Sequence, residues 1–110
     1  MPVKIIGFGQ VESAATIVFC ASKDRFSTKN CRFTIHEGTV TIGTPTLPLS
    51  VHQAQLQNAE VRRKAAVSIY AQTLKKSEEE VEALIKKGQS FDPEEARKLG
   101  LVTEIIDKLF

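Results

Sequence analysis

The sequence predicts a single α/β domain that covers residues 1–110, and its order of patterns leads to this fold class. Residues 3–6 are typical of a strand that ends at glycines, and residues 13–22 have the length of a helix. Short β-branched and aromatic stretches at 25–28, 32–37 and 39–44 predict further strands. Helical patterns follow from residue 50, and an extended segment at 101–106 closes the chain.

The first predicted helix and the longest one differ in pattern. Residues 13–22 are almost wholly apolar, so we expect that helix to be buried on every side. Residues 50–75 are rich in Ala, Gln, Glu, Arg and Lys, which predicts one long amphipathic helix. The apolar positions at helical spacing are Val51, Ala54, Val61, Ala65 and Ile69.

Two more helices are predicted from capping signals. Ser77, followed three residues later by Glu80, forms a capping-box pattern, and Gly88 is the expected end of that helix. Asp92 precedes a proline and two acidic residues, a pattern typical of a helix start, and Gly100 is expected to end the helix.

Composition narrows the classes of function. The formal net charge is +2, aromatic residues make up 6% and Trp is absent, so nucleic acid is a poor candidate partner. The apolar runs are shorter than a membrane span, and Cys20 and Cys31 lack partners at metal-ligand spacing. We therefore expect a cytoplasmic protein without a membrane span, in which both cysteines are small buried hydrophobes and not metal ligands.

Two residues can be interpreted as catalytic, and each also has a simpler structural interpretation. Ser13 follows a glycine-containing turn and begins a predicted helix, so it is either a helix N-cap or a nucleophile held at a sharp bend. His36 ends a strand of alternating residues, so it is either a half-exposed strand-end residue or a general base. Local sequence leaves both alternatives open.

Three segments of the sequence matter for the family resemblance: "GQVESAATIVFCASKDRFSTKNCRFTIHEG", "SFDPEEARKLGLVTEIID", and "TVTIGTPTLPLS" with the following helix. Together they resemble the C-terminal part of Clp protease proteolytic subunits, within the ClpP/crotonase superfamily. The first is similar to the family's serine block, apolar helix, arginine-containing hairpin and histidine-bearing strand. The second resembles its closing helix and strand, and the third resembles its handle. The implied fold is a ClpP/crotonase-like spiral of strand-strand-helix units, incomplete at the N-terminus, with a long handle-like helix.

The resemblance also implies roles for residues. It makes Ser13 the nucleophile, His36 the general base and the backbone amide of Ala14 one half of the oxyanion hole. The family's triad acid falls on Gly88, for which nearby Asp92 is a candidate substitute, although Asp92 is expected first as a helix cap. The strand implied to pair with substrate comprises Gly38, Thr39, Val40, Thr41 and Ile42.

By this resemblance we expect a serine endopeptidase of the ATP-dependent Clp type. Its substrates would be unfolded polypeptides fed by an ATP-dependent unfoldase into a ring-type homo-oligomer, without cofactor or metal. The alternative is a non-catalytic assembly or interaction subunit, favoured by Gly88 and by the absence of the family's N-terminal half. A crotonase-type acyl-CoA enzyme is a more distant third interpretation, because that chemistry makes no use of a Ser/His pair.

Overall fold

The strands form two small sheets. The structure is a computed structural model that describes residues 3–12, 14–37 and 46–107. One three-stranded sheet has the order β1-β3-β6 and contains β1 (Lys4–Gly7), β3 (Asp24–Thr28) and β6 (Glu104–Ile106), all parallel. The other has the order β2-β4-β5 and contains β2 (Gln10–Glu12), β4 (Arg32–Thr34) and β5 (Ser90–Phe91). In it β2 and β4 are parallel, whereas β4 and β5 are antiparallel.

The chain changes sheet twice in the same way. It passes from β1 to β2 at Gly9, whose left-handed φ of 77° is a conformation that glycine adopts without strain. It passes again from β3 in the first sheet to β4 in the second. The hairpin expected around Lys29 and Asn30 is therefore wrong, because the two flanking strands pair with different neighbours.

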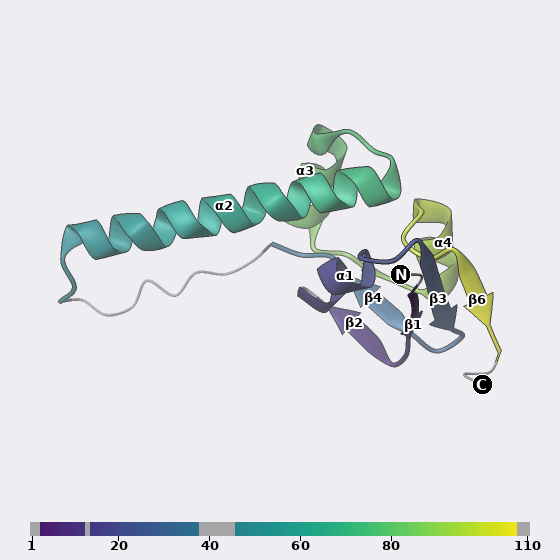
Figure 1. The fold of residues 1–110 in the computed structure, drawn as a ribbon. Coiled ribbons are helices and arrows are strands. Elements are labelled where there is room, and N and C mark those ends of the chain that lie inside the picture. Colours follow the sequence, from purple (N-terminus) through teal and green to yellow (C-terminus); the bar gives the residue numbers. More distant parts are fainter. Residues whose placement is uncertain (1–2, 13, 38–45, 108–110) are drawn as a thin grey trace.

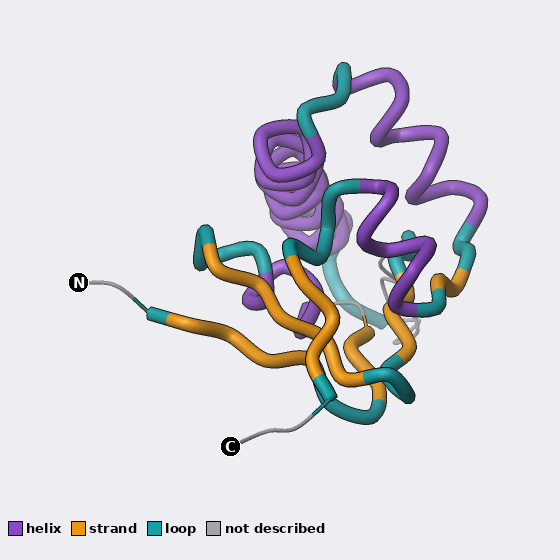
Figure 2. The backbone as a smooth tube through the Cα atoms, turned by 90° about the vertical axis from the view of Figure 1, so that its right-hand side faces the viewer, coloured by secondary structure: helices purple, strands orange, loops and turns teal. Residues whose placement is uncertain are grey.

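The helices in the described ranges are α1 (Ala14–Phe19), α2 (Leu49–Leu74), α3 (Glu78–Lys87) and α4 (Pro93–Leu99). Figure 2 shows the long helix α2 nearly end-on, above the strands. Figure 1 shows that most of α2 projects beyond the sheets. The radius of gyration is accordingly 16.0 Å, against about 13 Å for a compact domain of this length. Within the described ranges, no helix combines the length and the apolar character needed to cross a membrane.

The expectation that the first helix is buried all round is wrong. α1 has six residues, and its buried side chains are Thr16 and Phe19. Ala14, Ala15 and Val18 are exposed, because α1 packs with one side against the strands and α2. An apolar sequence thus leaves part of this short helix facing outward.

α2 confirms the predicted long helix and corrects its predicted apolar face. The side chains that it buries are Val67, Tyr70 and Leu74, all near its C-terminal end. Val51, Ala54, Val61 and Ala65 are exposed. The packing partners α1 and α3 contact α2 only where it overlies the strands, so position along the helix decides burial more than helical spacing does.

The two capped helices are confirmed. The Ser77 side chain accepts from the Glu80 backbone N–H at 3.2 Å, and α3 ends at Gly88 with a left-handed φ of 63°. The Asp92 side chain accepts from the Glu95 backbone N–H at 2.8 Å, and α4 ends at Gly100. Both capping boxes are complete, because each glutamate also accepts from the N-cap backbone.

The core lies between the second sheet, helices α1, α3 and α4, and the C-terminal part of α2. Its fully buried side chains include Phe33, Ile35, Val81 and Leu101. Phe19 of α1 packs on Phe33 of β4 with ring centroids 5.1 Å apart. A Cβ on Gly7 would stand 2.8 Å from the Phe33 ring, so a glycine is required for β1 to approach this core.

Arg25 fastens the C-terminal segment to the first sheet. Its guanidinium donates to the carbonyl oxygens of Ser22 at 2.7 Å, Leu101 at 2.8 Å and Gly100 at 3.2 Å. Thr103 adds a backbone and a hydroxyl donor to the Arg25 carbonyl, each at 2.7 Å. The bonds to Gly100, Leu101 and Thr103 join residues more than seventy positions apart and set where β6 begins beside β3.

Candidate active site

The register of β2 and β4 brings the carboxyl ends of these two strands to the same edge of the second sheet. Glu12, the last residue of β2, pairs with Thr34, the last residue of β4. The strands are parallel, so their carboxyl ends meet at one edge, where ligands and reacting groups commonly gather in α/β proteins. Ser13 follows Glu12 directly in the sequence and lies outside the described residues, whereas His36 follows Thr34 by two positions.

Thr16 joins the start of α1 to both of these strands. Its hydroxyl lies 3.3 Å from the Val11 carbonyl oxygen of β2 and 3.1 Å from the Thr34 carbonyl oxygen of β4. The side chain is fully buried, so this shared donation satisfies it where water has no access. A single hydroxyl thus fixes the helix that begins at Ala14 over the ends of the two strands.

His36 is exposed, and its ring is oriented by the backbone. Its Nδ1–H donates to the carbonyl oxygen of Glu37 at 2.9 Å. A carbonyl oxygen only accepts hydrogen bonds, so this contact requires the proton on Nδ1, and in the neutral imidazole the lone pair is then on Nε2. That tautomer is the one that a general base needs when Nε2 receives the proton.

Gly88 lies directly beside His36. A Cβ built on Gly88 would stand 3.7 Å from the Cβ of His36, which is ordinary van der Waals contact. Two bonds hold this segment against β4: the Ile35 N–H donates to the Gln89 carbonyl at 3.4 Å, and the Thr34 and Ser90 hydroxyls are 2.8 Å apart. A side chain at position 88 would therefore lie next to His36. Because the residue there is glycine, this position offers the histidine no carboxylate.

The remaining predicted site residues are less directly placed. Asp92 is engaged as the N-cap of α4, which gives its carboxylate a structural role. Ala14 is the first residue of α1, as an oxyanion donor at a helix start would be. Gly38, Thr39, Val40, Thr41 and Ile42 lie outside the described residues.

Sequence reasoning missed Thr16 and the segment formed by Gln89 and Ser90. The signal for Thr16 was a lone hydroxyl inside an apolar helix, which needs a buried acceptor. Gln89 and Ser90 follow the end of α3 directly, and their pairing with β4 joins residues more than fifty positions apart. Such pairing leaves no local pattern in the sequence.

The two cysteines are free and do not offer a competing nucleophile. Burial raises the pKa of both thiols, with Cys31 fully buried and Cys20 half-buried. A raised pKa lowers the fraction of reactive thiolate at neutral pH. The prediction that they act as small hydrophobes is confirmed for Cys31 and holds in part for Cys20.

Comparison with known proteins decides the family. The family profile described as Clp protease matches residues 1–109. The chain belongs to the Clp protease family. Among solved structures, a ClpP1 mutant from Listeria monocytogenes matches with a TM-score of 0.81 and 24% identity, over 98% of this chain and 58% of that one. A peptidase from Plasmodium falciparum matches with a TM-score of 0.80 and 20% identity, over 97% of this chain and 58% of that one.

These structural matches establish the fold. The expected ClpP-like fold with a long helix is confirmed, and the chain spans less than two thirds of the length of either solved structure. No curated protein sequence matches the chain. The family gives the reaction class from which a function is proposed, and the residues at the strand ends give the proposed chemistry.

Proposed function

We propose that this chain is a serine peptidase of the Clp type, with Ser13 as nucleophile and His36 as general base. The observation that supports the proposal is the parallel register that pairs Glu12 with Thr34, because it brings the carboxyl ends of both strands to one edge of the sheet. We propose a single domain over residues 1–110, unfolded polypeptides as substrates, and a cytoplasmic ring-type homo-oligomer served by an ATP-dependent unfoldase.

In the proposed reaction, Nε2 of His36 takes the proton as the Ser13 oxygen bonds to the peptide carbonyl carbon. The backbone N–H of Ala14, at the start of α1, donates to the oxyanion. His36 then gives the proton to the departing amine, and water hydrolyses the acyl-enzyme by the same route. Residues Gly38 to Ile42 would pair with the extended substrate backbone.

Because position 88 is a glycine and not an acid, we expect a low rate of peptide hydrolysis. The Glu37 carbonyl selects the required tautomer but carries no charge with which to stabilise the imidazolium that forms. Loss of the orienting carboxylate costs serine proteases about ten-thousandfold in kcat. We therefore propose a slow peptidase in which a backbone carbonyl does part of the work of the acid.

Substitutions at Gly88 test this proposal. Asp and Asn are nearly equal in shape and both tolerate a left-handed φ such as the 63° found here. Gly88→Asp should raise kcat on a fluorogenic peptide by about a hundredfold or more, because it places a carboxylate beside His36. The matched control Gly88→Asn should leave kcat close to that of the unchanged chain. Equal rates for the two variants, or no hydrolysis by any of the three proteins, would contradict the proposal.

One observation favours a second candidate function, a non-catalytic assembly subunit. Gly88 has a sufficient structural reason, since it ends α3 in a left-handed conformation and its N–H donates to the Leu84 carbonyl at 3.3 Å. A subunit without catalysis would fold and self-associate but leave Ser13 unreactive. Light scattering combined with active-site labelling distinguishes this candidate from the peptidase.

A further inference from the structure

Thr16 carries the single hydroxyl of α1, and its side chain is buried. The sequence of α1 is AATIVF, so the other five residues of this helix are apolar. Thr16 is 0% exposed. A buried hydroxyl is costly unless it is hydrogen-bonded, whereas valine has nearly the same shape and avoids that cost. The packing of α1 does not need this hydroxyl, so its hydrogen bonds are the feature that requires an explanation.

The hydrogen bonds of Thr16 tie α1 to the ends of two strands. The hydroxyl is 3.1 Å from the Thr34 carbonyl oxygen and 3.3 Å from the Val11 carbonyl oxygen. Thr16 comes three positions after Ser13 in the sequence. Thr34 comes two positions before His36, and the pairing of β2 with β4 ends at Thr34. One hydroxyl therefore joins the segment after the proposed nucleophile to the segment before the proposed base.

Tyr70 of α2 is a further partner of the Thr16 hydroxyl. Tyr70 is 3% exposed. Its burial and the nearby Cys20 raise the pKa of its hydroxyl, whereas a hydrogen bond with Thr16 lowers this pKa. The Thr16 hydroxyl donates its proton to the strand carbonyls, so in the bond with Tyr70 the Thr16 oxygen accepts and the Tyr70 hydroxyl donates. A chain of hydrogen bonds thus runs from Tyr70 through Thr16 to Thr34.

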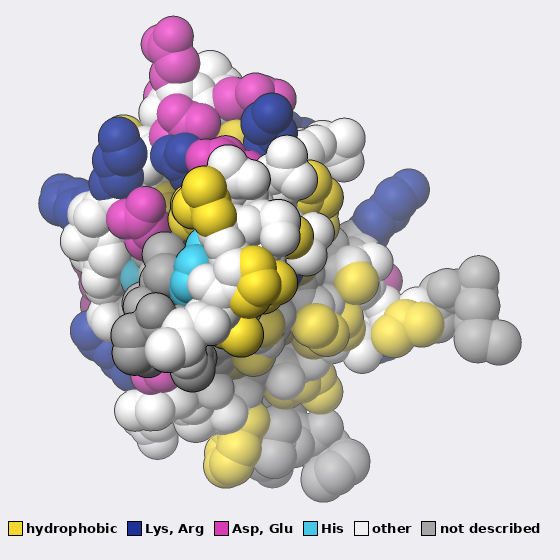
Figure 3. Space-filling view, turned by 90° about the vertical axis from the view of Figure 1, so that its left-hand side faces the viewer, with side chains coloured by type: hydrophobic (Ala, Val, Ile, Leu, Met, Phe, Trp, Pro, Cys, Tyr) yellow, Lys and Arg dark blue, Asp and Glu magenta, His cyan; other side chains and the backbone are white. Residues whose placement is uncertain are grey.

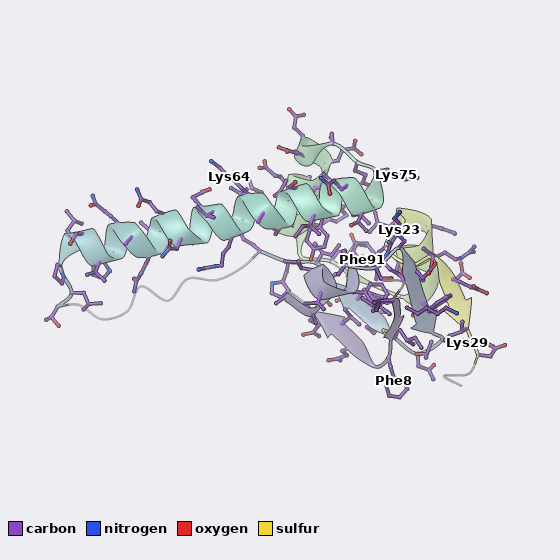
Figure 4. The ribbon with its side chains drawn as sticks, viewed as in Figure 1. Phe8, Lys23, Lys29, Lys64, Lys75 and Phe91 are labelled. Carbon is purple, nitrogen blue, oxygen red and sulfur yellow. The ribbon has the colours of Figure 1, made fainter. Side chains whose placement is uncertain are left out.

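The two hydroxyls lie where the C-terminal part of α2 overlies the strands. α1 packs against β2 and α2, and Tyr70 is among the side chains that α2 buries. Figure 4 shows side chains filling the space between this part of α2 and the strands, with Phe91 of β5 among them. Protein interiors are close-packed, so a displacement of Tyr70 would be transmitted to Thr16.

Charged side chains do not hold α1 in place. On the face shown in Figure 3, charged side chains lie mainly along the top and the left, at the surface of the molecule. Among the ion pairs of the described residues, the pair that joins two helices is Arg63 of α2 with Glu82 of α3, at 4.0 Å. α1 has no charged residue with which to form such a pair. Its side-chain link to the strands and to α2 is therefore the hydroxyl of Thr16.

We propose that Thr16 is a positioning residue that holds the start of α1 at a fixed distance from the end of β4, and that Tyr70 supports it. The inference rests on the proposed function, in which the Ala14 amide at the start of α1 binds the oxyanion and His36 follows β4. Neither hydroxyl transfers a proton in that reaction. Thr16 acts by setting the oxyanion donor relative to the base, and small errors in such positions greatly lower the rate of an enzyme.

Two substitutions of Thr16 in the 110-residue chain test this inference. Thr16→Val removes the hydroxyl and should lower kcat on a fluorogenic peptide by about tenfold or more, with KM changed by less than about twofold. Thr16→Ser keeps the hydroxyl and should restore kcat to within about threefold of the unchanged chain. An unchanged kcat in Thr16→Val, or a kcat in Thr16→Ser as low as that in Thr16→Val, would overturn the inference.

A double-mutant cycle tests the support from Tyr70. Tyr70→Phe removes that hydroxyl and should lower kcat by about threefold, and this effect should disappear when Thr16 is already valine, because Tyr70 acts through Thr16. Val81→Ala is the control for lost core stability, since Val81 is 0% exposed but belongs to α3, and its kcat should stay within about twofold of the unchanged chain. Additive effects in the cycle, or a loss of kcat in Val81→Ala as large as that in Thr16→Val, would overturn the inference.

Hydrogen exchange separates this inference from the proposed function. Thr16→Val should speed the exchange of backbone amides at residues 14–19 and 33–36, while residues 93–99 in α4 remain unchanged. The same exchange pattern in Thr16→Val and the unchanged chain would overturn the inference, whether or not the chain hydrolyses peptides. A local change in exchange together with a Ser13 that does not react with a fluorophosphonate would keep the link between α1 and β4 and remove the proposed function.

Discussion

The two ends of α2 show how little residue type alone decides burial. Near its C-terminal end, Tyr70 and Leu74 are 3% and 6% exposed, because α1 and α3 pack there. Near its N-terminal end, Leu49 and Leu56 are 72% and 49% exposed, although they are the same residue type as Leu74. The same helix therefore has an anchored end and a projecting end. The projecting end is helical because it continues from the anchored one and consists largely of good helix formers.

The largest expected difference between the two ends is in core packing. Leu74→Ala should lower the free energy of unfolding by about 2–5 kcal/mol, because it leaves a cavity among buried side chains. Leu56→Ala, at an exposed site of the same helix, should change it by less than about 0.5 kcal/mol. Chemical denaturation measures both values, and similar losses for the two variants would show that the projecting end is buried in solution.

The next largest effect on stability is expected from Arg25, whose hydrogen bonds hold the C-terminal segment to the first sheet. Arg25→Met keeps much of the side-chain volume but removes the donors to the Ser22, Gly100 and Leu101 carbonyls. We expect a loss of about 1–3 kcal/mol in the free energy of unfolding, since part-buried acceptors remain unsatisfied. Arg97→Met is the control, because Arg97 pairs with Glu94 on the surface. A loss for Arg97→Met as large as that for Arg25→Met would contradict this view.

Helix capping gives a smaller contrast. Asp92→Ala removes the acceptor for the Glu95 N–H and should cost about 1 kcal/mol. Pro48, at the N-terminal end of α2, makes no side-chain capping bond, so Pro48→Ala should cost less than Asp92→Ala. Thermal melts of the two variants test the difference. An equal shift in Tm for both would mean that the start of α2 is as firmly held as that of α4.

The smallest expected effect is on the reactivity of the two cysteines, which lie in the part of the chain that packs with the anchored end of α2. Burial raises the pKa of the Cys31 and Cys20 thiols, so the folded state binds their protons more tightly than the unfolded state does. Their contribution to stability is constant below the ordinary thiol pKa and falls as pH rises towards the raised folded pKa. Reaction with a disulfide reagent at mildly alkaline pH should be slower for the native chain than for the denatured one. Equal rates would show that these thiols are accessible.

Local signals in the sequence were enough for some parts of the fold. The capping boxes at Ser77 and Asp92 and the glycine ends at Gly88 and Gly100 were predictable, because each depends on residues within one turn. The burial of α2 was not, because it depends on where the rest of the chain packs. The pairing of β4 with β5 was also missed, since it joins residues more than fifty positions apart.

The candidate site divides in the same way. Ser13 and His36 were identified from their local setting and from the family resemblance, and these assignments remain proposals. The register that pairs Glu12 with Thr34 was not predictable from the sequence, and neither was the approach of Gly88 to His36. Both depend on strand pairing. The contact of His36 with the Glu37 carbonyl, which sets the tautomer of His36, was also unpredictable. Every residue has a backbone carbonyl, so no residue type signals such a contact.

The most direct test of the central claim is the reaction of the folded chain with a fluorophosphonate probe, followed by intact mass and peptide mapping. We predict one adduct on Ser13, formed about a hundredfold or more slowly in His36→Ala, because that variant lacks the general base. Ser13→Ala is the control and should form no adduct. A folded chain without an adduct, or one labelled at the same rate in His36→Ala, would contradict the claim that the ends of β2 and β4 form a serine peptidase site.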